Sequence, residues 1–285
     1  MRRFTLGLWG TANATVSGGA LLDASLDPAR CPFQLCPGAA VGLMAGTTAS
    51  FYIIGAESEA RFLNDFVVGG VGVNAGGGVL GGITRAAIEI RGGGILRTES
   101  VHIGGWASPG GNGNEKSFSA LVVTGQDSRW MVTGSSLFDA IVSSGTHPKG
   151  EATWMVADGA KLIIQAPIGS ERESHLRLAH GGGRSSMLVN DLGSELQVSG
   201  HIASINVGEN GGTAELSIRN GAQVTINGVA DSYINIGMPG SEGTVFVSGG
   251  TITGMRRLNV GLGGGKGQLL VSDKGVIKVG SVRVQ

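Results

Sequence analysis

The segment Leu216-Ser217-Ile218-Arg219-Asn220-Gly221-Ala222-Gln223-Val224-Thr225-Ile226 decides the fold. Apolar and polar residues alternate on both sides of an Asn-Gly turn, and a period of two is typical of β-strands. We call Ile218 the anchor of this segment. Equivalent anchors recur along the chain at Ile90, Val123, Val156, Val189, Ile218, Val247 and Val271, with spacings that shorten from 33 to 24 residues. A fixed pattern at such a period indicates a repeat protein.

A second apolar position, usually followed by glycine, marks each repeat. These markers are Ile103, Val142, Leu178, Val207, Ile236 and Val260. In the last four repeats the marker lies 11 residues before the next anchor, whereas the distance from anchor to marker varies from 13 to 22 residues. One arm of the repeat is therefore fixed in length, and the other accepts insertions.

The repeat predicts an all-β fold, a single-stranded parallel β-helix (β-solenoid) with about three short strands per coil. The 53 glycines are spread through the chain and the apolar spacing is two, so helical repeats are excluded. Stacked coils about 4.8 Å apart would align the inward Val, Ile and Leu residues in columns. Trp130 and Trp154 fall at positions equivalent to Leu196 and Leu216, so we expect them in this core.

We interpret the chain as one elongated domain with two parts. Residues 1–87 form irregular coils with a Cys/Pro insertion, two or three of them before Ile90, and residues 88–285 form regular repeats. The 21 basic and 21 acidic residues balance, so net charge favours no polyanion, and we expect no nucleic-acid partner. No apolar run is long enough to span a membrane as a helix.

The N-terminal region holds two features that bear on export. The start, Met1 to Gly10, is too short and too rich in glycine for a secretory signal. Cys31 and Cys36 lack the second pair that a zinc site requires; they would form a small disulfide loop in an exported chain and free thiols otherwise. Their state stays open.

Two residues after each anchor lies a turn position. It is occupied by Gly92, Gly125, Asp158, Asp191, Asn220, Gly249 and Asp273. Stacking would place Asp158 and Asp191 about one strand spacing apart, and paired carboxylates can act as acid and base or hold a cation. Asp and Asn are also favoured in tight turns. Because no Arg or Lys recurs beside these acids, we interpret them as turn residues and predict no catalytic residue.

Two loops interrupt the repeats. Gln165 to Ser174 extends the variable arm, and we expect binding there and a nearly unchanged melting temperature on its deletion. Trp106 to Ser117 is the second candidate. It contains Gly110 to Glu115, a partial match to a calcium-binding nonapeptide, but the aspartate is replaced, the apolar position is Ser117 and no tandem copy follows. We interpret it as a plain loop.

The remaining polar motifs predict no metal, cofactor or nucleotide site. The five histidines are His102, His147, His175, His180 and His201, and none has metal-ligand spacing. We interpret His175 and His180 as surface residues. The glycine clusters, such as Gly181 to Gly183, open strands rather than helices, which argues against a phosphate-binding loop.

The repeats resemble the glycine-rich β-helix repeats of bacterial autotransporter passenger domains. The likeness is carried by Val122 to Val132, Leu188 to Val198, Ile205 to Gly208 and Leu216 to Ala222, and it extends from about Ile88 to the end. It implies a right-handed β-helix at the cell surface of a Gram-negative bacterium, or released from it, and often a role in adhesion. The chain ends on a strand, Val279 to Val284, without a translocator barrel, so we expect a piece of a longer protein.

Two function classes follow. The first is a non-catalytic, surface-displayed or secreted passenger that binds a surface protein or glycan. The alternative is a β-helical polysaccharide lyase or glycoside hydrolase. The last coil, Gln268 to Gln285, presents an open strand edge without proline, so we also expect end-to-end self-association.

Overall fold

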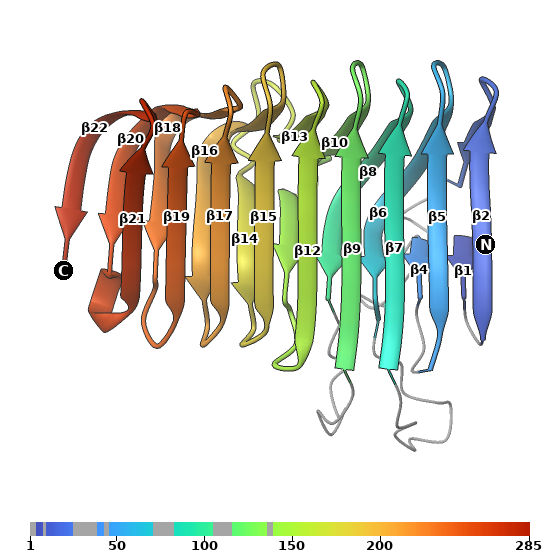
Figure 1. The fold of residues 1–285 in the computed structure, drawn as a ribbon, viewed down its shortest axis with the longest axis horizontal. Coiled ribbons are helices and arrows are strands. Elements are labelled where there is room, and N and C mark those ends of the chain that lie inside the picture. The colour runs from blue at the N-terminus through green and yellow to red at the C-terminus, as the bar shows by residue number, and fades with distance from the viewer. Residues whose placement is uncertain are drawn as a thin grey trace.

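The computed structural model describes residues 4–7, 10–24, 39–42, 46–70, 83–104, 116–135 and 139–285. The chain winds as a right-handed parallel β-solenoid, with the N-terminus at one end and the C-terminus at the other (Figure 1). The predicted fold class is confirmed. Among the described residues, the helical structure is one 3-10 turn, η2 (Leu262–Gly264). None of the described helices is long and apolar enough to cross a membrane.

The anchor arm of every coil belongs to one sheet of nine parallel strands. Its order is β2 (Thr11–Ser17), β5 (Thr48–Ile54), β7 (Ile83–Arg91), β9 (Lys116–Thr124), β12 (Gly150–Ala157), β15 (Arg184–Asn190), β17 (Thr213–Arg219), β19 (Glu242–Ser248) and β21 (Lys266–Ser272). Successive strands in this list are neighbours in the sheet, so each coil adds one strand.

The second sheet has thirteen strands among the described residues and follows two sides of the coil. They are β1 (Phe4–Leu6), β3 (Leu21–Asp23), β4 (Ala39–Val41), β6 (Glu59–Val68), β8 (Ile95–Ile103), β10 (Arg129–Thr133), β11 (Ala140–Ser144), β13 (Lys161–Gln165), β14 (Ser174–His180), β16 (Glu195–Glu209), β18 (Gln223–Ile236), β20 (Thr251–Val260) and β22 (Val276–Val284). Some coils contribute two separate strands here and others one long strand, such as β16, with a register shift at Gly200/Ile202. With the anchor strand this makes three strand segments per coil.

The predicted anchors form one column. Val123 pairs in register with Ile90 and Val156, and the alignment continues to Val271 at the C-terminal end. It also extends to Val16 and Ile53, so two anchor strands precede Ile90 among the described residues. The anchors are buried, except that Val271 on β21 is 49% exposed. The division at residue 87 stays a prediction, although β5 and β7 pair across it.

The marker column corrects one expectation. Val142 pairs with Val101 and Leu176, whereas Ser144 pairs with Ile103, so the predicted marker Val142 is wrong by two residues. Ser144 occupies the column as a fully buried polar residue, and its hydroxyl lies 2.7 Å from that of Ser185. The two hydroxyls satisfy each other, so the column tolerates them.

Aromatic side chains stack inside the N-terminal half. Trp130 and Trp154 are buried, as predicted, with ring centroids 5.8 Å apart. Ring contacts continue through Phe66 and Phe62 to Phe51. Aliphatic columns fill the later coils, so the chain has few aromatic residues overall but gathers them in one part of the core.

Candidate functional site

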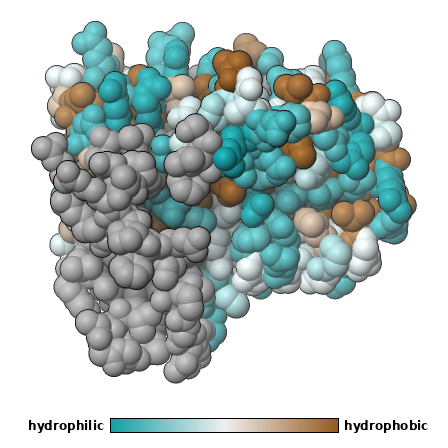
Figure 2. Space-filling model, turned by 180° about the vertical axis from the view of Figure 1, so that it is seen from behind, coloured by the Kyte–Doolittle hydropathy of each residue, from teal (hydrophilic) through white to brown (hydrophobic). Residues whose placement is uncertain are grey.

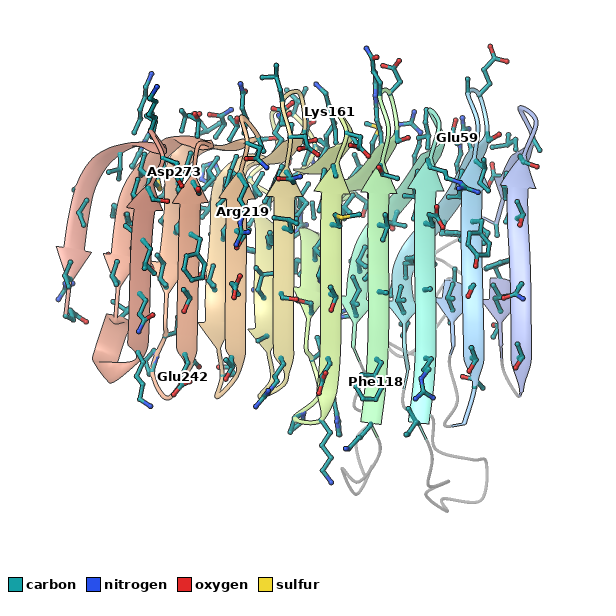
Figure 3. All side chains as sticks on the ribbon, in the orientation of Figure 1. Glu59, Phe118, Lys161, Arg219, Glu242 and Asp273 are labelled. Atoms are coloured by element: carbon teal, nitrogen blue, oxygen red, sulfur yellow. The ribbon has the colours of Figure 1, made fainter. Side chains whose placement is uncertain are left out.

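The turn after each anchor has a left-handed backbone in every predicted position. The φ angles are 63° at Gly92, 88° at Gly125, 55° at Asp158, 75° at Asp191, 53° at Asn220, 68° at Gly249 and 50° at Asp273. Gly, Asn and Asp are the residues that adopt this conformation most readily. The backbone geometry therefore accounts for these residue types, as the turn interpretation requires. The ladder runs along one edge of the solenoid, where Figure 3 labels Asp273.

A hollow of about 400 Å³ lies at this edge. Asp158 lines it together with Asp127, Arg129 and Lys161, whereas Asp191 does not. The expectation that no Arg or Lys accompanies the acids is wrong, because Arg129 and Lys161 pair in register on the following strands. The sequence contained a signal for these basic residues: Arg129 follows the turn residue Gly125 by four positions, and Lys161 follows Asp158 by three.

Both basic residues of this hollow have acidic partners. The Lys161 ammonium lies 3.1 Å from the Glu195 carboxylate, and Arg129 lies 3.7 Å from Asp127. The Asp158 carboxylate accepts a hydrogen bond from Thr124 at 2.6 Å. Lys161 lies at this edge in Figure 3. The hollow holds one of the two predicted carboxylates, so it does not bring the predicted pair of Asp158 and Asp191 together.

The loop from Gln165 to Ser174 is anchored at both ends. The Ala166 amide donates to the Ser199 carbonyl at 3.0 Å, and the Ser174 hydroxyl donates to the same carbonyl at 2.6 Å. The Glu173 amide donates to Asp139 on the preceding coil. Only the tip projects, with Ile168 92% exposed. We therefore expect deletion of the whole loop to destabilise the protein, and restrict the binding prediction to the tip.

The loop from Trp106 to Ser117 lies outside the described residues as far as residue 115, and so do Cys31 and Cys36. Lys116 and Ser117 begin β9. No group of three or more His, Cys, Asp or Glu side chains among the described residues could hold a metal ion.

The histidines on the second sheet correct a further expectation. His175, predicted at the surface, is only 6% exposed. Its Nδ1 lies 2.7 Å from the Ser204 hydroxyl, and its Nε2 lies 2.7 Å from the Glu173 carboxylate. His180 is partly exposed and pairs with Glu209 at 3.2 Å. Figure 2 shows the side of the solenoid behind the nine-stranded sheet, where hydrophilic residues are interspersed with hydrophobic ones.

Ser204, His175 and Glu173 have the connectivity of a Ser-His-carboxylate triad. A catalytic serine must reach the substrate, but Ser204 is fully buried, and the exposed member is the carboxylate. We assign these groups a structural role. The sequence signal was the 29-residue spacing of His175 and Ser204, which equals one repeat.

Three histidines have pKa values lowered from the ordinary value: His147 and His175, which are buried, and His102, which is partly exposed. Burial, reinforced by Arg177, lowers the pKa of His175 against the raising effect of Glu173. Burial also lowers the pKa of His102, where Asp65 opposes it and His180 and Arg177 add to it. His147 has a pKa lowered by burial and by Lys149.

The protein is therefore expected to lose stability as the pH falls below about 6.5, where the unfolded chain takes up protons that the folded chain refuses. The loss grows until the pH passes the folded-state pKa values and then stops. Glu209 affects stability at lower pH. Burial raises its pKa, but His180, Arg177 and Asn206 together hold that pKa below 4.5. The stability that the charged Glu209 carboxylate contributes is therefore lost only as the pH falls below 4.5.

Urea unfolding at pH 7.5 and 5.0 measures this effect. His175→Gln should reduce the difference in unfolding free energy between the two pH values, whereas His201→Gln, at a partly exposed position on β16, should leave it unchanged. An equal pH dependence in all three proteins would contradict the assignment to buried histidines.

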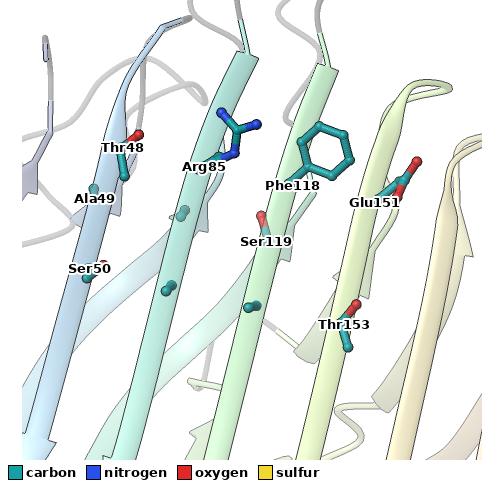
Figure 4. A pocket seen from close by; sticks show the side chains of 11 residues that line it. Thr48, Ala49, Ser50, Arg85, Phe118, Ser119, Glu151 and Thr153 are labelled. Atoms are coloured by element: carbon teal, nitrogen blue, oxygen red, sulfur yellow. The ribbon is translucent and has the colours of Figure 1, made fainter. Parts of the chain in front are cut away.

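A groove lies on the outer face of the nine-stranded sheet (Figure 4). One hollow of about 280 Å³ spans β5, β7, β9 and β12, and a second of about 320 Å³ continues it over β15, β17 and β19. Glu151 and Thr153 line both. The groove therefore runs along the solenoid axis, across the strands.

The floor and one wall of the groove are columns of outward side chains. The floor consists of small residues in register, Ser50, Ala87, Ala120, Thr153 and Ser186. The wall is the column Thr48, Arg85, Phe118, Glu151 and Arg184. We call this set of ten residues the axial groove. The Arg85 guanidinium lies over the Phe118 ring, 5.9 Å from its centroid.

The charged residues of the axial groove have no ionic partner among the residues that the structure describes. Arg85, Glu151 and Arg184 form no ion pair with any described residue, whereas Glu242 and Lys266, in the same column beyond the groove, pair at 2.6 Å. Elsewhere Glu59 bridges two arginines. The groove thus combines an aromatic ring with charged groups that form no ion pair to a described residue, and specific binding sites use such features for orientation.

No protein-family profile, curated protein or solved structure matches the chain. The autotransporter resemblance therefore rests on the repeats alone.

Proposed function

We propose that the chain is a non-catalytic binding module, displayed at the surface of a Gram-negative cell or secreted from it, that mediates adhesion. The observation that carries this proposal is the axial groove, a long exposed surface whose charged groups form no ion pair within the described part of the chain, on a stack of coils. A surface protein or a glycan is the ligand class. Pairing between the exposed edges of β21 and β22 and another copy stays a prediction.

The tip of the Gln165 to Ser174 loop is a second contact in this proposal. Ile168 projects into solvent on a loop whose ends are hydrogen-bonded into the coil, and loops held on rigid scaffolds commonly carry binding residues. Ile168→Ser should reduce attachment of the purified protein to its target cells while leaving the melting temperature unchanged. Leu192→Ser, at another exposed apolar turn residue, is the matched control. Equal attachment by both variants would remove the tip from the binding surface.

The alternative function, cleavage of an acidic polysaccharide, is favoured by the hollow that brings Asp158 beside Arg129 and Lys161. Incubation with polygalacturonate, followed by assays for reducing ends and unsaturated products, tests it. We expect no turnover. Turnover that disappears in Asp158→Asn would replace the binding proposal with an enzymatic one.

A further inference from the structure

We infer that the axial groove binds a linear glycan, laid along the solenoid axis over β7, β9, β12 and β15. This inference rests on the proposed function, because it names the ligand class and the contacts of the same binding module. The groove crosses the strands and is open at the surface, so it accepts an extended chain rather than a compact molecule.

The wall and the floor of the groove supply groups that recognise sugar hydroxyls. Arg85 and Arg184 donate hydrogen bonds, Glu151 accepts them, and the Thr153 hydroxyl does both. In-register strands set these residues about 4.8 Å apart per coil, so polar groups repeat along the direction of the bound chain. A polymer with a hydroxyl on every unit can pair with all of them.

The Phe118 ring provides an apolar surface between the charged residues. Its partly exposed side chain faces the groove beside Arg85 in Figure 4. Aromatic faces carry partial negative charge and attract the positive edges of other groups, which suits the C–H face of a sugar ring. The small floor residues Ala87 and Ala120 leave room for a ring to approach the sheet.

A peptide is the less suitable occupant. Peptides that bind β-sheets pair their backbone with a free strand edge, but the groove lies on the face of strands whose backbone groups are already paired on both sides. Recognition at this face depends on side chains alone. Arg85, Glu151 and Arg184, which form no ion pair with any described residue, therefore favour a ligand that brings hydroxyl groups on every unit.

Calorimetric titration of the full chain with a set of linear hexasaccharides, from cellulose, chitin and polygalacturonate, tests the inference. We expect saturable binding of at least one, weakened about tenfold or more by Phe118→Ala, equivalent to about 1.4 kcal/mol. Arg85→Gln should also weaken it. Lys266→Gln, in the same column beyond the groove, should leave it unchanged, and circular dichroism checks that all variants are folded.

Two results would overturn the inference: no binding of any of the three hexasaccharides, or equal affinity of Phe118→Ala, Arg85→Gln and the unchanged protein. Cell attachment measured in parallel distinguishes failure of the glycan inference from failure of the proposed adhesion function. Attachment that survives periodate oxidation of the target-cell glycans and is unaffected by Phe118→Ala would retain adhesion and exclude the glycan groove. Absence of both attachment and glycan binding would exclude both.

Discussion

Replacement of Val189 by aspartate is expected to destabilise the solenoid by more than about 4 kcal/mol. Val189 is fully buried and lies in register between Val156 and Ile218. The inward positions beside it in the column are aliphatic, so the structure offers a carboxylate no partner there. The side chain must either remain charged without solvation or bind a proton, and both are costly.

Urea unfolding followed by circular dichroism measures the loss. Ser186→Asp is the matched control, because Ser186 lies on the same strand, β15, with its side chain exposed on the outer face. We expect a change within about 0.5 kcal/mol for this surface substitution. Equal stability of the two variants would show that the anchor column is not the core.

The site at which a protease first cuts the Val189→Asp variant gives a second measurement. Each coil contacts only its neighbours, so a defect in one coil can separate the stack into parts. Limited proteolysis of Val189→Asp should therefore cut first between β12 and β17, where Val189 loses its partners. Uniform digestion along the chain would indicate that the solenoid unfolds as a single unit.

The sequence predicted the anchor column because each of its members is apolar and lies at the same point of the repeat. The prediction of the marker column failed at Ser144, where a polar residue occupies an otherwise apolar column and is satisfied by Ser185 on β15. Apolar periodicity cannot detect such a pair. Gly145 after it, with φ of 58°, was the better signal, because glycine follows most markers.

The polar columns on the second sheet were missed for a related reason. Asn206, Asn235 and Asn259 form a ladder, with side-chain hydrogen bonds of 3.0 and 2.8 Å between successive amides. Their spacings of 29 and 24 residues match those of the later anchors. The repeat therefore contained the information, but it had to be applied to polar residues as well as to apolar ones.

The axial groove was not predictable from any single motif. Its wall joins Arg85, Phe118 and Glu151, which are different residue types in successive coils, so no repeated pattern marks them. Only the register between strands, which depends on the lengths of all intervening loops, brings them into one column. The sequence could place each residue on an outward face but not beside the others.

Replacement of Gly208 by alanine is expected to cost about 3 kcal/mol, combining about 1–2 kcal/mol for a left-handed alanine with about 1–3 kcal/mol for a close contact. Gly208 follows the marker Val207 and has a φ of 80°. A Cβ atom there would lie 2.3 Å from the Glu242 carbonyl oxygen, which is backbone and cannot turn aside. The strand pairing at this corner would have to shift.

Ala179→Gly is the matched control for Gly208→Ala, because Ala179 follows the marker Leu178 in the preceding coil and already holds an alanine at a φ of 58°. The Ala179 methyl group fits because the neighbouring residue is Gly212. A Cβ atom on Gly212 would lie only 2.7 Å from the Ala179 Cβ. Relief of the left-handed strain and loss of a buried methyl group nearly cancel, so we expect a change within about 1 kcal/mol. Urea unfolding of both variants measures the difference. If Gly208→Ala proved as stable as the unchanged protein, close backbone approach would not be what requires glycine after the marker.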